Sequence, residues 1–102
     1  MKRGARFGLI VVFIVLNASF SSAGDLALGE YLSGECVTCH RPDGQDKGIP
    51  PIVGWPEDQF LAILQSYKAK ERPNQVMQTI TSRLSEEEMG ALAAYFAQLK
   101  SK

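Results

Sequence analysis

Apolar residues recur at helical spacing in three separate stretches of this chain of 102 residues. Asp25 can cap the first stretch, Pro56 and the two acidic residues after it suit the start of the second, and Ser85 opens a capping box before the third. The spacing predicts apolar stripes at Leu26, Leu28, Tyr31 and Leu32; at Phe60, Ile63, Leu64 and Tyr67; and at Met89, Leu92, Ala93, Phe96 and Leu99. No strand pattern follows residue 24, so we expect an all-α domain.

The segments between these predicted helices have a different character. Residues 41–54 are rich in glycine, proline and aspartate without a sustained period, which predicts a loop long enough to have a function of its own. The second helix ends in a basic cluster of Lys68, Lys70 and Arg72, which we interpret as a solvated helix end, with part of a docking surface as the alternative. Gly29 lies inside the first helix, where glycine costs about 1 kcal/mol relative to alanine. Either the glycine is simply tolerated there, or it marks the close approach of another helix.

The N-terminal residues have the composition of an export signal. A basic stretch over residues 1–6 precedes an unbroken apolar run over residues 9–16, and Ala23 ends a small-residue pattern that signal peptidase recognises. The run is shorter than the roughly 20 apolar residues of a membrane-spanning helix. We therefore expect a signal peptide over residues 1–23 and a periplasmic domain over residues 24–102, with no integral membrane span after cleavage. An uncleaved membrane anchor is the alternative.

Cleavage would change the balance of charge. The whole chain has 11 basic and 11 acidic residues, and three of the basic residues lie in the predicted signal, which leaves the mature domain near −3. No basic patch for nucleic acid remains, so nucleic acid is not an expected partner. A domain this small buries little surface and usually needs a staple such as a disulfide, a metal or a cofactor.

The sequence Cys36-Val37-Thr38-Cys39-His40 is the pattern C-x-x-C-H, which is typical of c-type haem attachment. Two thiols at this spacing can add to the two vinyl groups of one porphyrin edge, and the adjacent histidine can bind the iron. Three alternatives carry less weight. A Cys36–Cys39 disulfide would close too short a loop to restrain the unfolded chain much, and a redox dithiol would need a β-α-β pattern. A structural zinc site would need four ligands, whereas the chain has two cysteines and one histidine.

A second iron ligand must come from another residue type, because His40 is the only histidine. Met77 follows a proline break, in a stretch that we expect to be free to fold over the far face of the haem. Met89 lies on the apolar face of the last predicted helix, where methionine is usually core filler. We predict His40 and Met77 as the iron ligands. Met89, a lysine of the basic cluster (Lys68 or Lys70) and an open position are the alternatives.

With these residues in view, the chain resembles a class I cytochrome c, especially the small bacterial domains of the cytochrome c4, c5 and c553 groups. The matching segments are Cys36 to His40, Asp43-Gly44, Pro50 to Gly54, Tyr67-Lys68 with Arg72 ahead of Met77, Leu84-Ser85, and Leu92 to Phe96. The resemblance implies three to five helices packed around one covalently bound haem c. It also implies a close crossing of the first and last helices, which would involve Gly29, Tyr31, Leu92, Tyr95 and Phe96.

The resemblance assigns roles around the iron as well. It implies that the carbonyl of Pro50 accepts the ring N–H of His40, and that Met77 is the methionine ligand. A narrower likeness, carried by Val76-Met77-x-x-Ile80 and by the last helix, is to the cytochrome subunit of flavocytochrome c sulfide dehydrogenase. That subunit commonly carries two haems, whereas this chain has one C-x-x-C-H pattern.

The predicted function is that of a periplasmic monohaem electron carrier, which is not itself an enzyme. The narrower likeness adds a specific version, the electron-accepting cytochrome subunit of a sulfide dehydrogenase complex. Redox proteins are the expected partners, with a flavoprotein subunit as the specific case. A haem enzyme or gas-binding sensor is the alternative from another class, and it would need a labile sixth ligand on the iron.

Overall fold

The computed structural model describes residues 4, 8, 10–14 and 25–100. The described part contains α1 (Leu26–Val37), α2 (Glu57–Lys68), α3 (Gln75–Ser82) and α4 (Glu86–Gln98), and it contains no strand. The prediction of an all-α domain is therefore confirmed. None of the helices in these residues is long and apolar enough to cross a membrane. The expected cleavage site at Ala23 lies outside the described residues.

Side-chain caps begin the first and last helices as predicted. The Asp25 carboxylate accepts the backbone N–H groups of Ala27 and Leu28 at 3.0 and 3.2 Å. At α4, the Ser85 hydroxyl accepts the N–H of Glu88 at 3.1 Å, and the Glu88 carboxylate accepts the N–H of Ser85 at 2.9 Å. This reciprocal pair is the predicted capping box.

The helix α3 was not expected from the sequence. Its residues have little helical propensity, because Val76, Thr79 and Ile80 are all β-branched. Asn74 supplies the missing start signal, since its side chain accepts the N–H of Met77 at 3.1 Å. The helix also packs against α2. Tertiary contact and the cap therefore override local propensity, and the expectation of an irregular stretch around Met77 is wrong.

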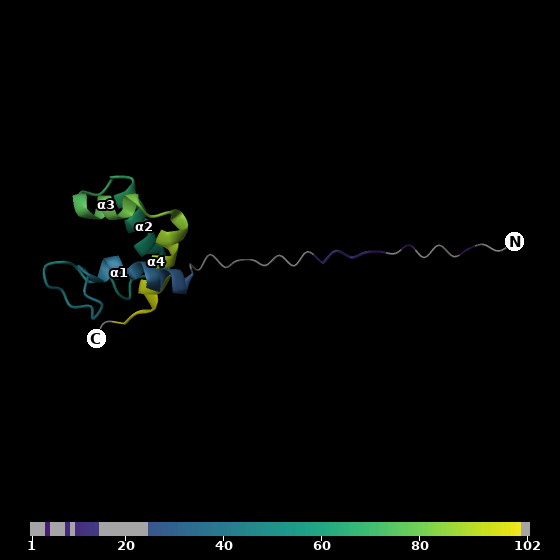
Figure 1. The fold of residues 1–102 in the computed structure, drawn as a ribbon, viewed down its shortest axis with the longest axis horizontal. Helices are drawn as coiled ribbons and strands as arrows, with labels where there is room; N and C mark the ends of the chain where they lie inside the picture. The colour runs from purple at the N-terminus through teal and green to yellow at the C-terminus, as the bar shows by residue number, and fades with distance from the viewer. Residues whose placement is uncertain (1–3, 5–7, 9, 15–24, 101–102) are drawn as a thin grey trace.

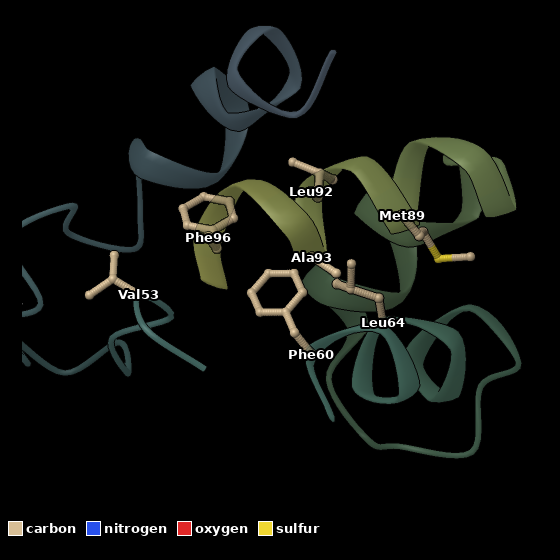
Figure 2. Close-up of a cluster of buried hydrophobic side chains, with 7 residues drawn as sticks. All are labelled: Val53, Phe60, Leu64, Met89, Leu92, Ala93 and Phe96. Atoms are coloured by element: carbon tan, nitrogen blue, oxygen red, sulfur yellow. The ribbon is translucent and has the colours of Figure 1, made fainter. Parts of the chain in front are cut away.

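The core lies between α4 and α2 and extends to the loop before α2 (Figure 2). Its buried hydrophobic cluster comprises Val53, Phe60, Leu64, Met89, Leu92, Ala93 and Phe96. The rings of Phe60 and Phe96 stack with centroids 5.4 Å apart. Because α4 contributes four of the seven members, the other helices are arranged around it.

The crossing of α1 and α4 depends on Gly29, as the sequence suggested. A Cβ atom at Gly29 would lie 2.2 Å from the carbonyl oxygen of Ala91 and 2.7 Å from Cβ of Tyr95, so no side chain fits there. Two other expectations for α1 are wrong. Tyr31 is 82 % exposed and Leu26 is 47 % exposed, so neither belongs to a buried stripe.

Residues 41–54 form the predicted loop, without helix or strand. In Figure 1 the loop extends beyond the C-terminal end of α1, while α2 and α3 lie on another side of the α1–α4 crossing. Its far end is fixed to α4, because the N–H of Gly54 donates to the carbonyl of Phe96 at 2.9 Å. Val53 next to it is buried in the core.

Candidate haem site

The C-x-x-C-H segment lies at the C-terminal end of α1. The helix ends at Val37, and the backbone N–H groups of Cys39 and His40 both donate to the carbonyl of Cys36, at 3.2 and 2.8 Å. Thr38 braces this turn through its hydroxyl, which donates to the carbonyl of Glu35 at 2.7 Å. The turn therefore gathers two thiols and one imidazole at one end of a rigid helix.

The two cysteines are not joined by a disulfide and differ in their surroundings. Cys39 is exposed, whereas Cys36 is partly buried among apolar side chains. Burial, helped by the negative charge of Glu35, raises the pKa of Cys36 to about 11. A reactive cysteine of a redox dithiol has a lowered pKa. The raised pKa of Cys36 therefore disfavours the dithiol alternative.

His40 is held by the loop. Its ring atom Nδ1 lies 2.7 Å from the carbonyl oxygen of Pro50, ten residues further along the chain. A carbonyl oxygen can only accept, so this contact places the proton on Nδ1 and leaves Nε2 as the nitrogen that can bind a metal. This is the contact that the resemblance implied for Pro50. Its role in haem binding stays a prediction.

The loop that delivers Pro50 has its own internal contacts. Arg41 forms an ion pair with Asp43 at 2.5 Å, and the Asp43 side chain also accepts the N–H of Gln45 at 2.9 Å. The Arg41 guanidinium and the Gln45 N–H together lower the pKa of the Asp43 carboxyl. Asp46 accepts the N–H of Gly48 at 2.9 Å. These short-range bonds shape the loop before it reaches Pro50.

The two candidate methionines are in very different places. Met89 is fully buried in the core cluster, so it serves as core filler. Met77 lies in the first turn of α3, is half-buried and packs at the edge of that cluster. Its thioether is therefore the more accessible of the two. No hydrogen bond within the described residues joins Met77 to His40, so the assignment of Met77 as a ligand stays a prediction.

An apolar cleft of about 450 Å³ opens beside Cys36, and we call it the Cys36 cleft. It is lined by Tyr31, Leu32, Gly34, Glu35, Cys36, Ile80, Arg83, Leu84, Glu88 and Leu92. Arg83 and Glu35 form an ion pair across it at 3.6 Å, with both side chains well exposed. The cleft contains one predicted attachment residue but not Cys39, His40 or Met77, which lie outside its lining.

These features fit a covalently bound porphyrin. One thiol lines an apolar cleft, the other is exposed, and the imidazole is oriented with Nε2 available. Partly buried apolar side chains from three helices and two connecting segments flank the core, namely Leu32, Val37, Ile52, Leu61, Met77 and Leu84. Leu32 and Leu84 among them also line the Cys36 cleft, which thus offers apolar surface beside the proposed attachment thiol.

Three residues near the site could not be singled out from the sequence. Arg83 and Glu35 meet only because α1 and the end of α3 are neighbours in the fold, so no local pattern marks them. Thr81 is fully buried and donates to the carbonyl of Met77 at 2.8 Å. Its position on the inner face of α3 would have been a usable signal if that helix had been predicted.

Residues 26–100 match the cytochrome c family over most of the chain. The chain belongs to the cytochrome c family. The four helices of the described residues agree with the expected class I cytochrome c fold, and the cofactor of this family is a covalently bound haem c with its iron. The protein is thus an electron-transfer cytochrome, and proteins of this class are typically exported.

Three relatives illustrate the range of similar proteins. The chain is 36% identical over 73 residues to a thiosulfate dehydrogenase electron acceptor of Stutzerimonas stutzeri, covering 67% of this chain and 34% of that protein. It is 31% identical over 93 residues to cytochrome c4 of Pseudomonas aeruginosa, covering 89% and 46%. It is 33% identical over 75 residues to the cytochrome subunit of sulfide dehydrogenase of Chlorobaculum tepidum, covering 72% and 68%. The chain therefore spans less than half of the first two relatives.

Proposed function

We propose that this cytochrome is a periplasmic monohaem electron carrier, exported with a signal peptide over residues 1–23. The single C-x-x-C-H pattern supports one haem. Cys36 and Cys39 would form the two thioether bonds, and His40 Nε2 would bind the iron. The observation that carries the proposal is the 2.7 Å contact between His40 Nδ1 and the Pro50 carbonyl, because it orients the imidazole for metal binding.

Met77 is the proposed second ligand. It is the half-buried methionine at the edge of the core, whereas Met89 is enclosed within the core. Ligation by histidine and methionine raises the reduction potential and leaves no coordination position for oxygen, which suits electron transfer and not gas binding. The carrier would accept and donate single electrons without binding a substrate of its own.

The proposed donor is a dehydrogenase that oxidises an inorganic sulfur compound, with a flavoprotein subunit as the specific case. Two kinds of relative support this class of partner, because one is named an electron acceptor of thiosulfate dehydrogenase and another the cytochrome subunit of sulfide dehydrogenase. Cytochrome c4 is similar to the chain at a comparable level, which supports the broader role of a general carrier.

Mass spectrometry and absorption spectroscopy of the purified protein test the attachment and the ligands. We expect one haem retained after acid-acetone extraction on a chain that begins at Gly24, and a weak far-red sulfur-to-iron band in the ferric state. Met77→Ala should abolish the band and admit cyanide, whereas Met89→Leu, which keeps the core volume, should retain it. Haem that extracts would refute covalent attachment. A band lost in Met89→Leu and kept in Met77→Ala would refute the ligand assignment.

A further inference from the structure

Thr81 is a buried polar residue in a place where an apolar residue of the same size would fit. It is fully buried on the inner face of α3, although the helix is only eight residues long and otherwise buries no complete side chain. A buried hydroxyl is costly unless it is hydrogen-bonded. The hydroxyl of Thr81 donates to the carbonyl of Met77 at 2.8 Å. The carbonyl of Gln78 is a second, more distant acceptor at 3.3 Å.

The other side of Met77 is held as well. The Asn74 side-chain oxygen accepts the backbone N–H of Met77 at 3.1 Å. Gln78 fixes the same turn to the preceding connection, because its side-chain amide donates to the carbonyl of Arg72 at 2.8 Å. Side chains therefore bind both the N–H and the C=O of Met77, the two backbone groups that flank the Cα atom from which the thioether extends.

Such a clamp matters because α3 is too short to be rigid by itself. An isolated helix of two turns is unstable in water, and both of its ends fray. Met77 lies in the first turn of α3 and is only half-buried, so neighbouring side chains do not enclose its thioether. The direction of the Met77 side chain consequently depends on how firmly its backbone is held.

We propose that Thr81 and Asn74 are positioning residues that hold Met77 in place for the iron. The proposal rests on the assignment of Met77 as the second ligand. Neither residue would touch the metal, and both would act through the backbone of Met77. Loss of either bond should let the thioether leave the iron more often, and an external ligand should then bind faster.

The sharpest test compares Thr81→Val with Thr79→Val in the haem-loaded protein. Both changes remove a threonine hydroxyl from α3, but the Thr79 hydroxyl donates to the carbonyl of Gln75 at 2.9 Å and is exposed. We expect cyanide to bind ferric Thr81→Val about three- to tenfold faster than the wild type, which corresponds to one net hydrogen bond. Thr79→Val should match the wild type, and Thr81→Ser, which keeps the hydroxyl, should restore most of the slow binding.

A second pair of variants covers the case in which Thr81→Val does not fold. Asn74→Ala removes the cap that holds Met77, whereas Ser85→Ala removes an equivalent cap from α4, which carries no proposed ligand. Faster cyanide binding and a weaker far-red band in Asn74→Ala alone would support the proposal. Equal effects of the two cap variants would show a general loss of stability and overturn it.

The outcomes separate this proposal from the ligand assignment. If Met77→Ala keeps the far-red band, the assignment of Met77 is wrong and the positioning proposal is wrong with it. If Met77→Ala loses the band while Thr81→Val and Asn74→Ala bind cyanide at the wild-type rate, the ligand assignment stands and the positioning proposal is refuted.

Discussion

Gly29 shows how the absence of one side chain fixes the contact between two helices. The space above its Cα is occupied by the backbone of Ala91 and by Cβ of Tyr95, neither of which can rotate away. Glycine costs helix stability at this position, and the closer packing of α1 on α4 offsets that cost. Since α1 ends in the C-x-x-C-H segment, the same contact places Cys36 relative to the core.

We expect Gly29→Ala to destabilise the haem-loaded protein by about 1–3 kcal/mol, because α1 and α4 must move apart to admit the Cβ atom. Gly90→Ala in α4 is the matched control. A Cβ atom there meets nothing within 4 Å, so the change should stabilise the protein by up to about 1 kcal/mol through helix propensity. Urea denaturation followed by circular dichroism measures both values. A Gly29→Ala protein as stable as Gly90→Ala would contradict the proposed crossing.

The sequence predicted site residues best where the site is formed by residues that are neighbours in the sequence. The candidate attachment residues Cys36, Cys39 and His40 could be selected because their spacing is itself the pattern. The ion pair of Glu35 with Arg83 depends instead on α1 and the end of α3 meeting in space, which no local pattern encodes. The exposure of Tyr31 has the same origin, because helical spacing does not say how wide a face the partner helix covers.

At the scale of elements, the helices with strong end signals were predicted well. Asp25 and Ser85 both cap the helices that they were expected to cap, and in α4 the apolar residues repeat from Met89 to Phe96. In α3, Met77, Ile80 and Thr81 do lie at helical spacing, but the helix has only eight residues and the pattern is correspondingly short. It exists because Asn74 caps it and α2 supports it, and Lys68 of α2 also donates to the carbonyl of Leu84 just after α3.

The capping box of α4 makes stability depend on pH in a defined direction. The backbone N–H and hydroxyl of Ser85, with a smaller contribution from Lys68, lower the pKa of Glu88 in the folded protein. A lowered pKa means that the folded state favours the carboxylate. The stabilisation is therefore complete above the ordinary glutamate pKa of about 4.3, and it is lost as the pH falls through the lower pKa of the folded state.

We accordingly expect the wild type to lose more stability between pH 6 and pH 3 than Glu88→Gln, whose side chain does not titrate. Glu87→Gln is the control, because it removes the same charge from the same helical turn without breaking the bond to the Ser85 N–H. Urea denaturation at a series of pH values provides the comparison. If the stability of Glu88→Gln depended on pH as strongly as that of the wild type, the capping box would not be the source of the pH dependence.

At the scale of the whole molecule, the fold follows from one central helix. α4 contributes most of the core, α1 and α2 pack directly against it, and the loop over residues 41–54 is fixed to its end through Gly54. An all-α fold could be predicted because three amphipathic stripes need to be buried together. The path of the loop could not be predicted from local sequence patterns, since Pro50 reaches His40 only when both ends of the loop are fixed.

The distribution of charge over the molecule gives the last prediction, which concerns the proposed redox partner. The mature domain would be near −3, and the lining of the Cys36 cleft contains Glu35 and Glu88 against the single cation Arg83. Cys36 is a proposed point of haem attachment, so an electron would enter or leave beside the negatively charged lining of this cleft. A partner that docks there should therefore present a basic surface.

We expect the rate of haem reduction by a sulfur-oxidising flavoprotein dehydrogenase to fall as the salt concentration rises, because ions screen the attraction between the two surfaces. Glu35→Gln should reduce both the rate at low salt and its salt dependence. Glu57→Gln removes the same charge at the start of α2, outside the lining of the cleft, and should change the rate less. Stopped-flow absorption measurements at several ionic strengths give these rates. A rate that increases with salt, or equal effects of the two variants, would place docking on a different surface, for which the cluster of Lys68, Lys70 and Arg72 is the next candidate.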